Sequence, residues 1–136
     1  MDRDELAVEY FEKVNNCAQA VLAGCADLTG LDEKTALAIA GGFGGGVTCG
    51  EVCGALCGAV MALGMIFPNN CVPPDEAAKA RLHRITNDCC ARFREEFGTV
   101  LCRELLEKAP NYMRCPEFVQ FAAQLVGDLA EENNAI

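Results

Sequence analysis

The feature that most constrains this chain is a long stretch with almost no charge. Between Thr35 and Pro74 the only charged residue is Glu51. The longest uninterrupted apolar run, residues 52–67, has 16 residues, fewer than the roughly 20 that a helix needs to span a bilayer. A helix that is apolar on all sides must be buried, in lipid or in protein. We therefore expect no membrane insertion, and we expect this run to form the centre of a helical bundle.

The rest of the chain has helical periodicity almost throughout, and no segment alternates with period two. Asn16, Asp32 and Thr48 are predicted helix caps, and a Pro after Cys115 indicates another helix start. The sequence thus predicts an all-α, single-domain bundle of six or seven helices around a Gly/Cys-rich apolar central helix, with one domain over residues 1–136. The predicted helices cover residues 4–14, 16–30, 32–40, 48–67, 75–96, 98–108 and 115–129.

Charge and cysteine content narrow the function. The formal net charge of −9 argues against a nucleic-acid partner, which would require a basic face. The acidic N-terminus lacks the features of a signal peptide, so we expect a cytoplasmic protein. Because structural disulfides are rare in the cytoplasm, the ten cysteines are better interpreted as buried apolar residues, metal ligands or redox thiols.

Several cysteines fall at predicted helix starts. Cys17 follows the Asn16 cap, Cys49 follows Thr48, and Cys102 and Cys115 lie near the starts of the last two helices. Unpaired backbone N–H groups and the positive end of the helix dipole favour the thiolate there, the form that binds metals and attacks disulfides. The alternative for each is packing, since cysteine is often buried.

The remaining cysteines divide into two groups. Cys25 and Cys89 fall on the apolar faces of their predicted helices, which favours packing. Cys90 is adjacent to Cys89 but points about 100° away, and Cys71 lies in a predicted loop. The sequence assigns no chemical role to Cys71, Cys89 or Cys90.

The segment CGEVCGALCG, residues 49–58, combines regularly spaced cysteines and glycines. If it is one helix, Cys49, Cys53 and Cys57 share a face at spacing four, beside a smooth stripe formed by Gly50, Gly54 and Gly58. Such a stripe lets a second helix or a cofactor approach the backbone, and it could serve as a homodimer seam. The spacing is not the CxxC of zinc ribbons or thioredoxin-like proteins.

These residues also carry a family resemblance. The chain resembles the C_GCAxxG_C_C family, whose members are described as redox-active, over nearly its whole length. The family's CGAxxG motif stands here as residues 53–58, including the motif glycines Gly54 and Gly58. The resemblance implies that the four family cysteines are Cys17, Cys53, Cys102 and Cys115, in the contexts NNCAQAV, CGALCG, FGTVLCREL and RCPEF.

We therefore expect a redox protein whose Cys17, Cys53, Cys102 and Cys115 converge as ligands of a metal centre. Cys49 and Cys57 are candidate additional ligands. An iron–sulfur cluster is the favoured cofactor and zinc the alternative. Two other readings stay open: a metal-free thiol–disulfide protein, in which Cys17 and Cys53 are one candidate pair, and a non-redox zinc or interaction module. The metal-centre and thiol–disulfide hypotheses both call for a redox partner protein or a small redox molecule.

Overall fold

The computed structural model describes residues 1–109 and 113–136, and the fold in these residues is all-α. The elements are α1 (Arg3–Val14), α2 (Cys17–Gly24), α3 (Ala26–Thr29), α4 (Glu33–Ala40), the π-helical turn η1 (Gly46–Gly50), α5 (Gly54–Ile66), α6 (Glu76–Phe97), α7 (Cys102–Lys108) and α8 (Cys115–Glu132). The prediction of an all-α single domain is confirmed. The described part holds more helical elements than the six or seven predicted.

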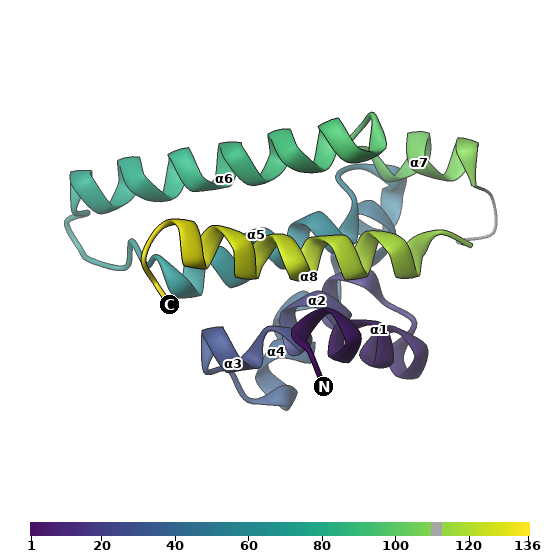
Figure 1. The fold of residues 1–136 in the computed structure, drawn as a ribbon, viewed down its shortest axis with the longest axis horizontal. Helices are drawn as coiled ribbons and strands as arrows, with labels where there is room; N and C mark the ends of the chain where they lie inside the picture. Colours follow the sequence, from purple (N-terminus) through teal and green to yellow (C-terminus); the bar gives the residue numbers. More distant parts are fainter. Residues whose placement is uncertain (110–112) are drawn as a thin grey trace.

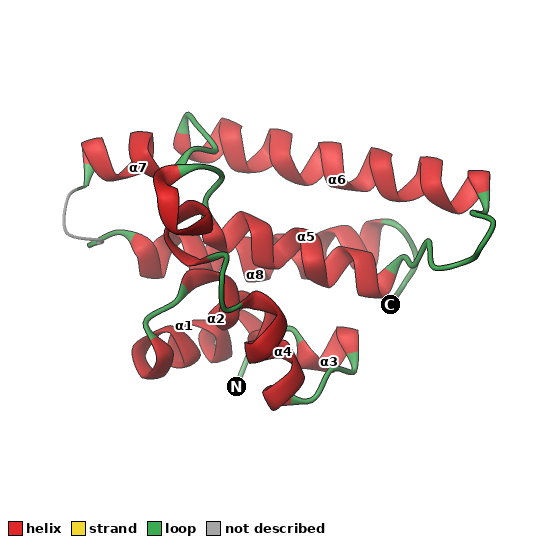
Figure 2. Cartoon of the chain, turned by 180° about the vertical axis from the view of Figure 1, so that it is seen from behind, coloured by secondary structure: helices red, strands yellow, loops and turns green. Residues whose placement is uncertain are grey.

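The helices form three layers, as Figures 1 and 2 show. Helices α1 to α4 make one layer, α5 and α8 make the middle layer, and α6 covers the opposite face. Contacts of α5 with α2, α3, α6 and α8 place it at the centre. Most of the apolar run therefore lies inside protein, as predicted, although Val52 and Met65 are exposed. No helix within the described ranges has the length and apolar character needed to cross a membrane.

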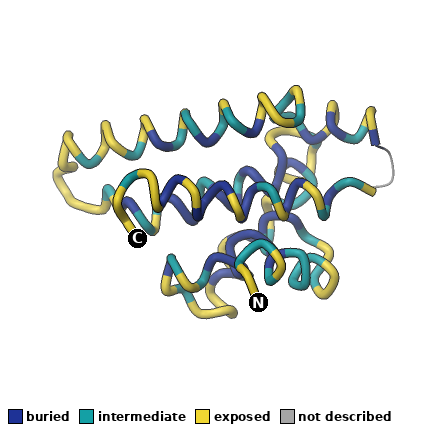
Figure 3. The backbone as a smooth tube through the Cα atoms, viewed as in Figure 1, coloured by how far each residue is buried: buried dark blue, intermediate teal, exposed yellow. Residues whose placement is uncertain are grey.

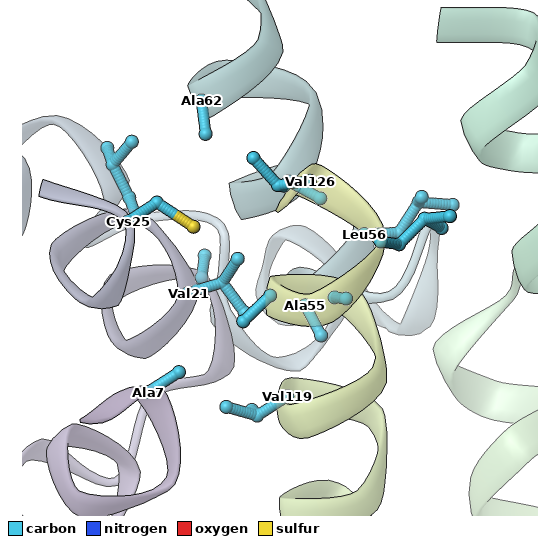
Figure 4. Packing of buried hydrophobic residues seen from close by; sticks show 14 of the residues in the cluster. Ala7, Val21, Cys25, Ala55, Leu56, Ala62, Val119 and Val126 are labelled. Atoms are coloured by element: carbon cyan, nitrogen blue, oxygen red, sulfur yellow. The ribbon is translucent and has the colours of Figure 1, made fainter. Parts of the chain in front are cut away.

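The core consists mainly of small and medium side chains on α2, α5 and α8 (Figure 3), while the outer face of α6 is exposed. Small side chains let helix axes approach closely. The Cys25 sulfur lies within this core, among residues such as Val21, Ala62 and Val126 (Figure 4), and both Cys25 and Cys89 are fully buried. Their predicted role in packing is confirmed.

Two of the three predicted helix caps, Asn16 and Asp32, are confirmed. The Asn16 side chain accepts a hydrogen bond from the Gln19 backbone N–H at 3.0 Å, and Asp32 accepts one from Thr35 N–H at 3.1 Å. Asp75 caps α6 in the same way. Such caps satisfy backbone donors that the first turn leaves without partners. The predicted helix over residues 16–30 differs, because it divides at Cys25 into α2 and α3.

The start of the central helix was predicted wrongly. Thr48 does not cap it. Gly45, Gly46, Val47 and Thr48 all have positive φ, between 58° and 67°, and this left-handed stretch cannot continue into a right-handed helix. Helix α5 begins only at Gly54, with Cys53 as its N-cap. Cys49, Cys53 and Cys57 therefore do not share one helical face.

The glycine stripe serves a contact within the chain. A Cβ atom on Gly58 would lie 2.7 Å from the Ala18 carbonyl oxygen of α2, and one on Gly54 would lie 2.9 Å from the Phe43 carbonyl oxygen. Both glycines thus allow close approach of α5 to the N-terminal layer. Gly50 lies outside α5, so the predicted stripe is shorter. A homodimer stays a prediction without support from this stripe.

Candidate functional site: a four-thiol pocket

Four cysteines meet in one small pocket. Cys17, Cys102 and Cys115 are the first residues of α2, α7 and α8, and Cys53 is the N-cap of α5. Their exposed fractions are 8%, 7%, 4% and 3%, respectively. Together with Gly45, Gly54, Leu105, Leu106 and Phe118 they line a cavity of about 20 Å³. We call this the thiol pocket. Its other walls offer no polar side chain.

Two backbone hydrogen bonds bring the second and third cysteines together. The Cys53 N–H donates to the Val100 carbonyl at 2.8 Å, and the Cys102 N–H donates to the Glu51 carbonyl at 2.7 Å. They frame a single antiparallel bridge between Val52 and Leu101. This bridge joins segments about fifty residues apart and sets Cys53 beside the start of α7.

The left-handed stretch before α5 forms another wall. A Cβ on Gly46 would lie 2.6 Å from the Cys102 Cβ and 2.5 Å from the Glu51 carbonyl oxygen, so this position requires glycine. Val47 and Thr48 hold φ values of 58°, a conformation that costs free energy for β-branched residues. The chain keeps a strained turn directly against the thiol pocket.

Cys17 and Cys115 form an asymmetric pair. A side-chain hydrogen bond between the Cys17 and Cys115 thiols raises the pKa of Cys17 and lowers the pKa of Cys115. Burial and the charges of the other three cysteines raise the pKa of Cys17 further. Cys115 is therefore the thiol of this pair that ionises first.

Cys53 and Cys102 are harder to ionise. Burial raises the pKa of Cys53 to about 12, against the opposing effect of hydrogen bonds from the backbone of Leu56 and Ala55. Burial, followed by the charge on Cys115, raises the pKa of Cys102. Among the described residues, no basic side chain contributes to the pKa shifts of these four thiols. Without added positive charge, the pocket does not support four thiolates.

The pocket has an open side. Cys17 and Cys115 also line a larger outer cavity of about 340 Å³, together with Phe11, Asn15, Asn16, Gly44 and Gly45. Cys53 and Cys102 line only the inner pocket. The outer cavity therefore gives a small molecule access to one half of the cluster.

The two additional candidates lie apart from this pocket. Cys49 is exposed and its thiol donates to the Gly46 carbonyl at 3.6 Å. Cys57 is half-buried on α5, and its thiol donates to the Val52 carbonyl at 3.6 Å. Neither lines the thiol pocket. Glu51 forms an ion pair with Arg103 at 3.3 Å.

Two features of the site have no sequence signal that could have revealed them. The hydrogen-bonded partner of Cys17 is Cys115, 98 residues away, rather than Cys53. The backbone bridge between Val52 and Leu101 is also long-range. Helix-start position identified three of the four pocket cysteines, and the family resemblance supplied Cys53.

The four thiols share a pocket, but they are not arranged as the ligands of a metal ion. Across residues 1–109 and 113–136, no group of three or more His, Cys, Asp or Glu side chains is arranged to hold a metal ion. The ligand roles of the four cysteines therefore stay a prediction.

Comparison with known proteins identifies one family. The family model described as "Putative redox-active protein (C_GCAxxG_C_C)" matches residues 15–129, a range that includes all four pocket cysteines. No protein of curated function and no solved structure matches the chain.

Proposed function

Because the chain belongs to the C_GCAxxG_C_C family, we propose that it is a redox protein whose thiol pocket binds a metal centre, most favourably an iron–sulfur cluster. In this role it carries electrons or senses redox state. The observation that carries the proposal is the convergence of Cys17, Cys53, Cys102 and Cys115, from four helix starts, in one small apolar pocket.

The donor chemistry fits such a centre. Thiolates are soft ligands that select iron–sulfur clusters, zinc or copper over magnesium and calcium. The pocket walls contain no carboxylate, which a hard cation would need. Iron is favoured over zinc because zinc does not change its oxidation state.

The electrostatics of the pocket point the same way. The charges of neighbouring cysteines raise the pKa values of Cys17, Cys53 and Cys102, so ionising all four needs a compensating cation. Backbone N–H groups at the start of α5 stabilise the charged form of Cys53, and the N-termini of α2 and α8 supply partial positive charge. A bound metal centre would provide the rest and would hold the cysteines deprotonated.

The proposal requires the sulfurs to rearrange. Since the described residues contain no preformed group of three or more metal ligands, and the cavity between the four thiols is only about 20 Å³, the pocket would have to rearrange when a centre binds. Cys17 and Cys115 face the outer cavity, which is the side from which metal and sulfide would enter.

The test is anaerobic reconstitution with iron and sulfide, followed by metal analysis and visible absorption spectroscopy. We expect a broad visible absorption that bleaches with dithionite. Single Cys→Ser substitutions at the four pocket cysteines should each reduce bound iron, while Cys71→Ser, in an exposed loop, serves as the matched control. A colourless, metal-free protein would refute the proposal. Stoichiometric zinc without colour would favour a zinc module.

A second candidate function is metal-free thiol–disulfide exchange by Cys17 and Cys115. Their hydrogen bond and their shared access to the outer cavity favour this pair over Cys17 and Cys53. The Cys115 thiolate would attack one sulfur of an external disulfide and release one thiolate. Cys17, after losing its proton to water, would attack the Cys115 sulfur and release the second. The pair loses two electrons, and the external disulfide gains them.

The two functions are separated by the Cys53→Ser variant. Metal binding depends on Cys53, whereas exchange by Cys17 and Cys115 does not. The second function would be established by two results together. The unsubstituted protein would take up no iron, and the Cys53→Ser variant would keep full exchange with oxidised glutathione.

A further inference from the structure

Two cysteines outside the thiol pocket lie on neighbouring helices. Cys57 is on α5 and Cys90 is on α6, and both are half-buried. The two helices contact each other and run in opposite directions, because α5 ends and α6 begins at the same end of the molecule (Figure 1). Neither cysteine belongs to the four that line the thiol pocket.

The register of the two helices sets these cysteines at the same level. At the shared end, the Arg81 guanidinium lies 4.8 Å from the centre of the Phe67 ring. Cys57 precedes Phe67 by ten positions, and Cys90 follows Arg81 by nine. At a rise of about 1.5 Å per residue, both lie roughly 14 to 15 Å from that end. Cys90 packs against the core cluster from α6.

The charges around the two sulfurs are unequal. After burial, the charge on Cys90 is the next cause that raises the pKa of Cys57, which agrees with their proximity. Burial also raises the pKa of Cys90, but Arg94, one helical turn further along α6, opposes that rise. Cys89 is fully buried, and burial raises its pKa to about 12. Arg94 thus favours Cys90 as the attacking thiolate.

We propose that Cys57 and Cys90 form a second redox site, a reversible disulfide that joins α5 to α6. The oxidant is a low-molecular-weight disulfide. The Cys90 thiolate attacks one of its sulfurs, breaks the S–S bond and releases one thiolate. Cys57 then loses its proton to water, attacks the Cys90 sulfur and displaces the second thiolate. The two cysteines lose two electrons, and the external disulfide is reduced to two thiols.

This site can influence the thiol pocket through α5. Cys57 lies one helical turn after Cys53, the N-cap that lines the pocket. A covalent link to α6 would restrain the first turns of α5, and with them the position of Cys53. The disulfide would also join positions 57 and 90, and closing such a loop restricts the unfolded chain.

The experiment treats the full chain with oxidised glutathione, blocks the remaining thiols with iodoacetamide, and maps the peptides by mass spectrometry. We expect a linked pair of peptides containing Cys57 and Cys90 that dithiothreitol separates. The oxidised chain should also unfold at a higher urea concentration than the reduced chain. Cys57→Ser and Cys90→Ser should both lose the link and this shift.

Two controls make the result decisive. Cys71→Ser should keep the link, as should Cys115→Ser, which removes a pocket thiol. The second control separates this proposal from the function proposed for the thiol pocket. Recovery of Cys57 and Cys90 with separate glutathione adducts would overturn the proposal, as would linkage of Cys57 to Cys89 in the unsubstituted chain. Far-UV circular dichroism of each variant checks that it is folded.

Discussion

Replacing Gly58 by Ala tests the contact that joins the central helix to the N-terminal layer. The added Cβ would lie 2.7 Å from the Ala18 carbonyl oxygen and 3.0 Å from the Val21 Cβ. The first of these is a backbone atom, so relief requires a shift of α2 or α5. Overpacking of this kind costs about 1–3 kcal/mol, whereas Ala in a helix interior gains about 0.5–1 kcal/mol over Gly. The expected net loss of unfolding free energy is about 1–2 kcal/mol.

Gly64→Ala is the matched control for this change. Gly64 is in the same helix, but a Cβ there would meet no atom within 4 Å. The same propensity gain should therefore appear alone, as an increase of about 0.5–1 kcal/mol. Because this gain is common to both variants, they should differ by the overpacking cost alone, about 1–3 kcal/mol.

The measurement is urea unfolding followed by far-UV circular dichroism, with a reducing agent present to keep the ten cysteines as thiols. Equal stabilisation by Gly58→Ala and Gly64→Ala would refute the described contact between α2 and α5. Because α2 begins with Cys17, that result would also remove the basis for placing Cys17 beside Cys53.

Three further predictions concern ionisation and capping. Cys115 should react with iodoacetamide before Cys53 as the pH is raised, because the pKa of Cys115 is lowered while burial raises that of Cys53 to about 12. Peptide mass spectrometry at successive pH values shows the order of reaction. The reverse order would contradict the statement that Cys115 ionises first. Burial raises the pKa of Cys25 from 9.0 to about 12 in the folded state. The contribution of the neutral Cys25 thiol to the free energy of unfolding is therefore complete below pH 9. It is lost as the pH rises toward 12, by about 1.4 kcal/mol per pH unit. Cys25→Ala should flatten that decline in urea unfolding at alkaline pH, and an unchanged slope would show that Cys25 does not cause it. Asp75→Ala removes the side chain that accepts from Ala77 N–H at 3.0 Å and should cost about 1 kcal/mol in urea unfolding, whereas Asp75→Asn should be nearly neutral.

Local sequence signals determined most of the helices. The apolar run of residues 52–67 had to be buried, and its length was insufficient to span a bilayer, so a central helix followed. The caps at Asn16 and Asp32 depend on a side chain and a backbone donor a few positions away. Such interactions are encoded locally, and the sequence therefore predicted them.

The predicted cap at Thr48 failed for a tertiary reason. Thr48 and Glu51 have the spacing of a capping box, yet the chain there turns left-handed, with Gly46 against Cys102. Close contact with the start of α7 determines this conformation, and no local pattern reports it.

The same division holds for the thiols. Sequence position placed Cys17, Cys102 and Cys115 near helix starts, and the family resemblance added Cys53 to them. Only the tertiary structure decided that these four share one pocket, that Cys17 pairs with Cys115, and that Cys49 and Cys57 lie elsewhere. The reason is physical: helix capping acts over about four residues, whereas the pocket depends on how α2, α5, α7 and α8 pack.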